Sequence, residues 1–275
     1  MVKSSDEAHF FDNLQDEMPS DSPLSRRAVL TGATLFAAQS LAPAADQKSP
    51  KIAIFSKHLQ FLQGDALAAC AAEIGFDGID ITVRKGGHIA PEHARQDLPK
   101  LVEMIRKQGL EVPMITTDIV DSETPFAVDV IETMAELGIR RYRWGGFKYH
   151  GNASIAEQLD RLKPRVAKLA ALNSKHKVAA MYHTHSGVNL VGASIWDLHI
   201  LLDGLDPAAV GVNYDIGHAT IEGGAGGWIH SFRITGPHLL GVAVKDFIWA
   251  KDANGKWRTE WTPLGQGMAP LSQLF

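Results

Sequence analysis

A regular alternation of short apolar runs with longer amphipathic segments, from Lys51 onward, most constrains the fold of this chain. Seven runs have the length and β-branched content of strands, at 51–56, 78–83, 112–117, 140–145, 178–183, 210–215 and 240–246. Helical periodicity occupies segments between them, at 64–74, 95–108, 124–137, 153–172 and 194–204. This alternation predicts successive βα units on a parallel sheet.

A (β/α)8 TIM barrel fits this series better than a doubly wound sheet. The residues that close the first predicted strand and follow it, "FSKHLQFL", contain no glycine, whereas a dinucleotide-binding sheet has a Gly-rich phosphate loop there. Barrels of about 200–250 residues form one domain, so the length of 275 residues requires no second core. We expect an α/β barrel that stops before its eighth βα unit, with a hairpin at Asn254-Gly255 beside its mouth.

Residues 1–48 differ from the predicted barrel at 49–275 and indicate an export signal. A polar, acidic run precedes Arg26-Arg27, a mildly apolar stretch and the small residues Ala42-Pro43-Ala44. This order is typical of a twin-arginine signal and predicts a periplasmic protein. An uncleaved anchor or a cytoplasmic tail is the alternative, but polar interruptions weaken the stretch as a membrane span of about 20 residues.

The composition narrows the choice of partners. The formal net charge is −4 and no basic stripe is present, so we expect no nucleic acid partner. No later segment is apolar enough for a stable membrane span once the signal is removed. Cys70 is the single cysteine, which excludes an internal disulfide. The sequence is compatible with a homo-oligomer.

The ends of the predicted strands are rich in histidine and charge, and barrel enzymes place their catalytic groups at these ends. In "MYHTHSG" (181–187), His183 and His185 alternate with Thr184, so both imidazoles lie on one face of the strand. With Asp215 and His218 of "NYDIGH", His183 forms a mixed nitrogen and oxygen set suited to Mn²⁺, Zn²⁺, Co²⁺ or Mg²⁺. Each histidine could instead be an ordinary hydrogen-bonded residue at a strand end.

The chain resembles the sugar phosphate isomerase/epimerase superfamily with a xylose isomerase-like TIM barrel, which includes D-tagatose 3-epimerase and, more distantly, endonuclease IV. The segments that carry the resemblance are "GFDGIDITVR" (75–84), "YHTHSG" (182–187), "YDIGHA" (214–219), "VKDF" (244–247) and "PLGQG" (263–267). The resemblance implies that His183 and Asp215 bind metal and that His218 contacts substrate or metal. The chain departs from the family at Ala243, which replaces a ligand histidine, and it has no counterpart of the glutamate ligand on the eighth strand.

The resemblance implies a metal-dependent sugar isomerase or epimerase that moves a proton next to a carbonyl through an enediolate. The candidates for proton transfer or oxyanion stabilisation are His185, Lys245 and His88. The candidates for binding a small carbohydrate substrate are His58, Arg84, Trp144 and His218. Arg84 could instead pair with Asp80 or Glu92.

Two other functions remain open. A periplasmic lyase or hydrolase of keto-glycosides would use the same enolisation to expel a leaving group. A vestigial, non-catalytic sugar-binding barrel would agree with Ala243 and with the absent eighth strand. Phosphodiester cleavage is the least expected function, because the acidic chain has no basic groove that could follow phosphates.

Overall fold

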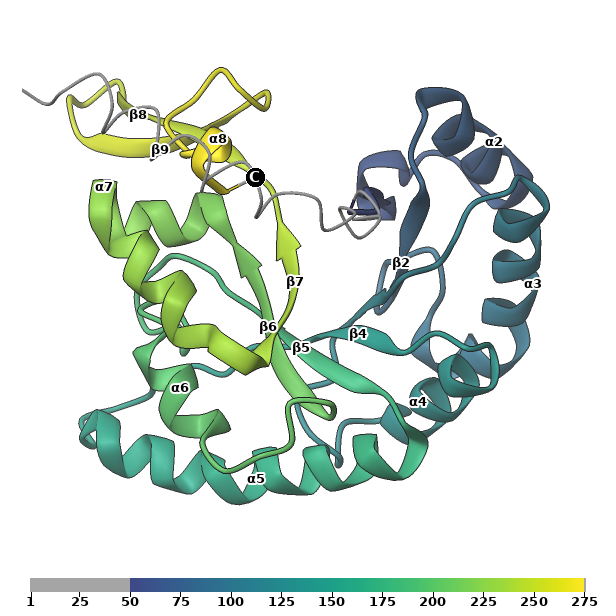
Figure 1. Cartoon of the computed structure of the whole chain (residues 1–275), viewed down its shortest axis with the longest axis horizontal. Helices are drawn as coiled ribbons and strands as arrows, with labels where there is room; N and C mark the ends of the chain where they lie inside the picture. Colours follow the sequence, from purple (N-terminus) through teal and green to yellow (C-terminus); the bar gives the residue numbers. More distant parts are fainter. Residues whose placement is uncertain (1–49, 275) are drawn as a thin grey trace, which may run out of the picture. The chain divides into compact units, whose positions relative to one another are not determined.

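The structure, a computed structural model, describes residues 50–274. Its main sheet has seven parallel strands in chain order. They are β1 (Ala53–Phe55), β2 (Gly78–Val83), β3 (Ile115–Thr117), β4 (Arg141–Trp144), β5 (Ala179–His183), β6 (Val210–Asp215) and β7 (Leu239–Ala243). Figure 1 shows a curled sheet with helices along its outer side. The predicted α/β barrel architecture is confirmed with seven strands, and no eighth strand joins this sheet within residues 50–274.

Helices connect successive strands. They are α2 (Gly64–Ile74), α3 (Ala94–Lys107), α4 (Ala127–Glu136), α5 (Ile155–His176), α6 (Trp196–Leu202) and α7 (Ile216–Thr235), with short 3-10 turns η1 (Ser56–Leu59), η2 (Pro91–His93) and η3 (Gly236–His238). Local signals define several ends. Helix α2 stops at Gly75, which takes a φ of 96°, and α5 starts with a capping box between Ser154 and Glu157.

Helix α7 is a long helix that the sequence pattern does not predict. Four glycines lie between residues 223 and 227, and glycine lowers helix propensity. The backbone of Gly224 is in fact non-helical, with φ 60° and ψ −156°. The helix nevertheless forms, because its first turn is capped at Asp215 and Trp228 is buried.

Alternation along the strands separates the apolar core from a polar interior. In β2, Ile79, Ile81 and Val83 belong to the buried core. Asp80 and Thr82 alternate with them and bond to hydroxyl groups on the neighbouring segments. The polar residues of the strands therefore collect on the inner side of the curled sheet.

The predicted hairpin follows β7 directly. Strands β8 (Asp246–Lys251) and β9 (Trp257–Thr262) pair antiparallel, with Gly255 of the connecting turn at a φ of 75°. Asp246 is 2% exposed and accepts hydrogen bonds from the backbone N–H groups of Phe247, Gly265, Gly267 and Ala269. This carboxylate therefore fixes the "PLGQG" loop, which leads to α8 (Leu271–Leu274), to the start of the hairpin.

No helix within residues 50–274 combines the length and apolar character needed to cross a bilayer. The predicted twin-arginine signal lies in residues 1–49, outside the described part of the chain.

Candidate active site

Polar side chains from the carboxyl ends of β4 to β7 lie together at one end of the sheet. We call this group the Lys245 cluster, and it consists of Arg143, His183, His185, Asp215, His218 and Lys245. The structure therefore brings together the predicted metal ligands with two of the three predicted catalytic residues. Parallel strands explain the gathering, because all their carboxyl ends lie at the same edge.

Asp215 is the buried anion of the Lys245 cluster. Its side chain is 0% exposed, and Oδ1 accepts the His218 N–H at 3.1 Å, which caps α7. The Nζ of Lys245 lies 2.8 Å from Oδ2. A Cβ on Gly217 would lie 2.9 Å from the Lys245 carbonyl oxygen, so glycine permits this close approach. Burial opposes ionisation of Asp215, but His183 and Lys245 outweigh it and hold the pKa below its usual range.

Three imidazoles surround this ion pair. The ring centroids of His183 and His185 are 4.7 Å apart, as expected for side chains on one face of a strand, and those of His185 and His218 are 4.4 Å apart. Burial lowers the pKa of His183 and of His218 to about 4, and that of His185 to about 2. All three rings are therefore neutral at neutral pH.

Two of the three neutral rings accept a hydrogen bond from a cation, and the third, His183, has Asn213 Nδ2 3.1 Å from its Nδ1. Arg143 Nη2 donates to His185 Nε2 at 2.9 Å, and Lys245 Nζ donates to His218 Nε2 at 3.0 Å. Because His218 Nε2 accepts a hydrogen bond, its Nδ1 carries the proton and faces Ser186 Oγ at 2.8 Å. The two cations therefore orient His185 and His218 and keep their own positive charges at the site.

The predicted metal site depends on how the ligand atoms are arranged. His183 Nε2 and Asp215 Oδ2 are 3.3 Å apart, and both atoms are buried. Two ligands that each lie about 2.0–2.2 Å from one cation could have this separation. The Lys245 ammonium, however, lies against the same oxygen, and no three His, Cys, Asp or Glu side chains within residues 50–274 are grouped to hold a metal ion. As arranged, these residues do not fit a divalent ion, and the cation at Asp215 is Lys245.

Two other predicted residues lie outside the Lys245 cluster. His88 is held in the loop after β2, where Nδ1 lies 3.1 Å from Thr82 Oγ1 and Nε2 lies 3.1 Å from the Leu62 carbonyl oxygen. Both ring nitrogens are thus used in fixing this loop, and His88 is not brought to the other catalytic candidates. His58 is exposed beside β1, and its ring meets that of Phe55 edge to face.

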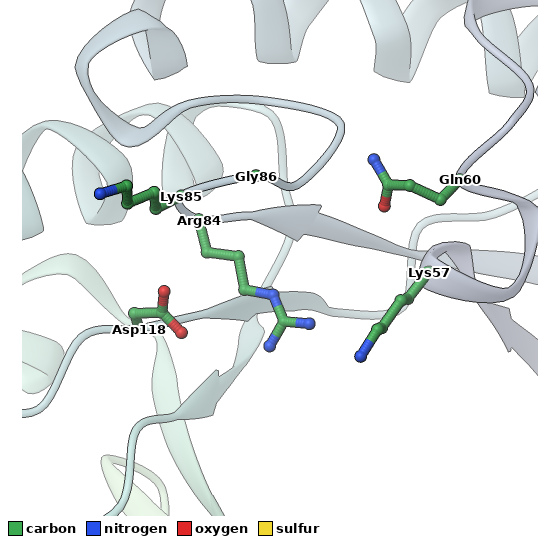
Figure 2. Close-up of a pocket in the computed structure, with 6 residues that line it drawn as sticks. All are labelled: Lys57, Gln60, Arg84, Lys85, Gly86 and Asp118. Atoms are coloured by element: carbon green, nitrogen blue, oxygen red, sulfur yellow. The ribbon is translucent and has the colours of Figure 1, made fainter.

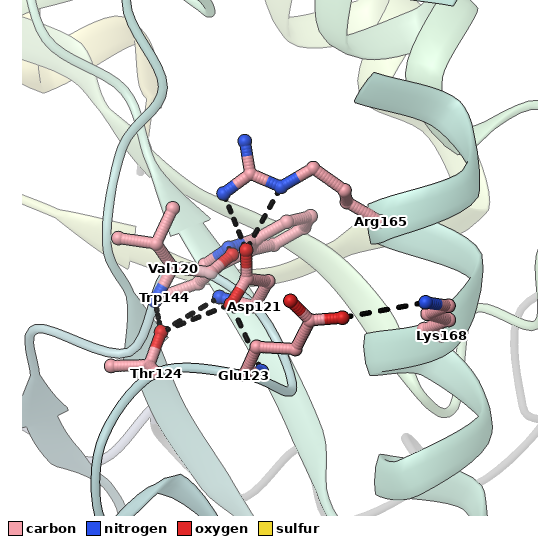
Figure 3. A network of polar contacts seen from close by, with 7 residues as sticks. All are labelled: Val120, Asp121, Glu123, Thr124, Trp144, Arg165 and Lys168. Carbon is pink, nitrogen blue, oxygen red and sulfur yellow. Dashed lines mark hydrogen bonds and ion pairs between the residues drawn. The ribbon is translucent and has the colours of Figure 1, made fainter. Parts of the chain in front are cut away.

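Trp144 is 2% exposed and belongs to the core, so its ring offers no surface for a sugar. Its Nε1 donates to the Val120 carbonyl oxygen at 2.8 Å (Figure 3). Thr124 bonds to the same loop through the backbone N–H of Val120, and Arg165 of α5 pairs with Asp121. Trp144 therefore anchors the loop after β3, which differs from its predicted role in substrate binding.

Trp261 of β9 is a site residue that the sequence analysis does not name. Trp261 is 52% exposed, its ring centroid lies 4.9 Å from that of His218, and Lys245 Nζ lies 5.4 Å from the same centroid. The hairpin thus places an aromatic surface directly on the Lys245 cluster. The only sequence signal was the pair of Trp-bearing runs around the turn.

Asp80 of β2 is a second residue without a predicted role of its own. Thr116 Oγ1 donates to its Oδ2 at 2.8 Å, while the buried Oδ1 has no hydrogen-bond partner in the described residues. Burial raises the pKa of Asp80 to about 7, against the hydrogen bond from Thr116 and the charges of Arg143 and Arg84. Neither of the carboxylates considered for Arg84 forms an ion pair with it within residues 50–274.

Solved structures with the same fold include a D-tagatose 3-epimerase-like protein, which is 17% identical with a TM-score of 0.61 over 81% of this chain and 83% of that one. The probable 3-DHS dehydratase AsbF from Bacillus anthracis is 17% identical, with a TM-score of 0.60 over 82% and 87% of the two chains. The IOLI protein, solved with a zinc atom, is 14% identical, with a TM-score of 0.63 over 81% and 82%. These likenesses establish a shared fold, and the zinc atom makes a divalent ion compatible with that fold.

No curated protein matches the chain significantly in sequence. The profile of one family, described as xylose isomerase-like TIM barrel, matches residues 68–275. This range includes the Lys245 cluster and six of the seven strands of the sheet. The chain therefore belongs to the xylose isomerase-like TIM barrel family, as its sequence resemblance predicts.

Proposed function

We propose that this protein moves a proton at a carbon next to the carbonyl of a carbohydrate, in an isomerisation or epimerisation through an enediolate. The observation that supports this best is the Lys245 cluster, in which two cations and three neutral imidazoles meet at the carboxyl ends of β4 to β7. Membership of the xylose isomerase-like family agrees with an enzyme of this kind.

Lys245 and Arg143 are the groups that would stabilise negative charge on the substrate. The Lys245 side chain is 36% exposed, so its ammonium is anchored by Asp215 and still reachable from outside. As the proton leaves carbon, charge develops on the carbonyl oxygen, and a fixed cation stabilises that oxygen more than it stabilises the ketone. The chain thus supplies from its own residues the positive charge that a divalent ion would supply in a metal-dependent relative.

His185 is the proton carrier in this proposal. It is half-buried and neutral, and it lies between His183 and His218. Burial is the largest cause of its low pKa, followed by repulsion from His183 and His218 when these are protonated, and then by the charges of Lys245 and Arg143. The lone pair of the neutral ring is on Nε2, which accepts from Arg143, so His185 would take up the proton there once Arg143 turned to the developing oxyanion. The negative charge of the enediolate would also favour the imidazolium.

Trp261 favours a carbohydrate over other carbonyl compounds. Its half-exposed ring lies next to Lys245, where the apolar C–H face of a sugar could stack while the hydroxyl groups remain hydrated. A small pocket-bound substrate with a few fixed polar contacts is also the usual form of recognition in such barrels.

Export through the twin-arginine signal is part of the proposal and rests on Arg26-Arg27 and the residues that follow them. In the periplasm, a keto-glycoside is an alternative substrate, since enolisation would expel the group on the neighbouring carbon.

Hydrogen exchange tests the reaction directly. The purified protein is incubated in D₂O with a panel of ketoses, aldoses and keto-glycosides, and proton NMR follows the signal of the C–H next to each carbonyl. We expect deuterium incorporation with at least one neutral or acidic sugar, and loss of exchange in Lys245→Met. Release of an aglycone would assign the lyase reaction instead. Binding of sugar without exchange in any member of the panel would contradict the enzyme and favour a sugar-binding barrel.

A further inference from the structure

A cavity of about 470 Å³ lies at the carboxyl ends of β1 to β3, apart from the residues of the Lys245 cluster. It is lined by Lys57, Gln60, Arg84, Lys85, Gly86 and Asp118 (Figure 2). Three chain segments contribute these residues: the turn after β1, the loop after β2 and the end of β3. The cavity is therefore built by the same edge of the sheet that carries the proposed active site.

The lining of the cavity has an excess of positive charge. The lining includes three cations, Lys57, Arg84 and Lys85, and a single carboxylate, that of Asp118. None of the three cations forms an ion pair with a carboxylate within residues 50–274. A concave surface with unpaired cations of this kind favours the binding of anions.

Arg84 is the most enclosed of these cations, since Lys57 and Lys85 are exposed. It is half-buried, and its guanidinium carbon lies 5.6 Å from the centre of the Phe55 ring. Its backbone is fixed as well, because its N–H donates to the Ile89 carbonyl oxygen at 3.0 Å and its carbonyl oxygen accepts the Gly87 N–H at 2.8 Å. Figure 2 shows the Arg84 and Lys57 side chains directed into the same space. The donors are therefore partly preorganised, which lowers the entropic cost of binding.

We propose that this cavity binds an oxyanion, a carboxylate or a phosphate group, and that the group is part of the substrate. A guanidinium presents paired N–H donors that match two oxygens of either group, and an ammonium such as that of Lys57 adds a third donor. Asp118 would then face the hydroxyl groups next to the anion and not the anion itself.

Arg143 connects the cavity to the proposed active site. Its charge interacts with those of Arg84 and Asp118 at the cavity and with that of Asp215 in the Lys245 cluster. A sugar whose anionic group occupied the cavity could thus extend its carbonyl end toward Lys245. The assignment of the anion to the substrate rests on the proposed function, whereas the binding of the anion does not.

Calorimetric titration of the full chain tests the cavity without any need for activity. The probes are inorganic phosphate, D-gluconate and the neutral D-glucitol, at constant ionic strength. Arg84→Met is compared with Arg141→Met, which removes the same charge from an exposed arginine. Arg141 is the first residue of β4, at the end of the sheet away from the cavity. Lys57→Met is a second cavity variant in case Arg84→Met does not fold, and circular dichroism checks all variants.

We expect at least one anion to bind the wild-type protein, D-glucitol not to bind, and Arg84→Met to weaken the binding by about tenfold or more, as for a lost charge-assisted hydrogen bond. Tighter binding of phosphate than of D-gluconate would identify a sugar phosphate as the ligand. Tighter binding of D-gluconate would identify a sugar acid. Equal weakening in Arg141→Met, or no binding of either anion, would overturn the site. Anion binding in a protein without exchange activity would refute the proposed function and leave the anion site standing.

Discussion

The ammonium of Lys245 lies 2.8 Å from Oδ2 of Asp215, a carboxylate that is 0% exposed. His183 Nε2 approaches the same oxygen at 3.3 Å. Lys245 therefore provides a fixed positive charge at this position. Its interaction with Asp215 is weakly screened by water, because the carboxylate is buried. This relationship links the fold to the proposed chemistry, because it places a cation at the mouth of the barrel without an added ligand.

If the Lys245 ammonium excludes a divalent ion, then Lys245→Ala will gain metal affinity. The substitution frees Asp215 Oδ2 and His218 Nε2, both of which the ammonium occupies, and it removes the repulsion between that ammonium and a bound metal ion. We expect Zn²⁺ to bind the variant at least about tenfold more tightly than wild type, a change of about 1.4 kcal/mol. Calorimetric titration measures the affinities, and Lys251→Ala, on the hairpin, is the matched control. Tight stoichiometric Zn²⁺ in the wild-type protein would show that lysine and metal are compatible here.

Trp261→Ala tests the stacking surface. The ring is half-exposed, so its removal should cost little stability but should weaken sugar binding by about 0.5–1.5 kcal/mol, or roughly two- to tenfold in KM. Steady-state kinetics on the substrate found by hydrogen exchange gives KM and kcat, and kcat should change less than KM. Trp257→Ala provides the control, since Trp257 is 63% exposed on the same hairpin and stacks on Lys251. Equal effects of the two substitutions would remove the specific role of Trp261.

Asp80 should make the stability of the protein depend on pH. Its pKa is raised by burial from 3.8 to about 7, so between these values the folded protein keeps a proton that the unfolded chain releases. Stability therefore falls as pH rises across this window, and Asp80→Asn should escape the loss. From pH 4 to pH 8 the free energy of unfolding of the variant, relative to wild type, should rise by about 3–4 kcal/mol. Urea denaturation at several pH values measures it, and parallel curves for the two proteins would contradict the assignment.

Asp246→Asn should loosen the hairpin and the loop that follows it. The carboxylate accepts four backbone N–H groups, and an amide has one acceptor oxygen in place of two. We expect a loss of about 2–4 kcal/mol in the free energy of unfolding, from buried donors left without partners. Asp252→Asn is the control, because Asp252 also bonds to backbone N–H groups but lies in the exposed turn of the hairpin. If Asp246→Asn lowered the free energy of unfolding no more than Asp252→Asn does, Asp246 would not be what holds the loop to the hairpin.

Much of the fold follows from local sequence. The bounds predicted for β2, β6 and α2 agree with the structure, because alternation, helical periodicity and Gly75 act within each segment. Helix α7 was missed, since its glycines lower the local propensity and only burial of residues such as Trp228 compensates for them. Trp144 is a second example, because an aromatic residue at a strand end can face either the core or the active site, and the sequence does not show which of the two it faces.

The sequence by itself determined the parallel βα architecture, the family and the presence of His183, His185, Asp215, His218 and Lys245 at strand ends, because period and order along the chain are local properties. Only the tertiary structure decided which of these atoms meet. Side-chain directions and the approach of distant segments decide whether Lys245 reaches Asp215 and whether Trp261 packs against His218. They also decide that His88 bonds to the loop after β2 and does not join the other catalytic candidates. Those distances are set by packing, which no local pattern encodes.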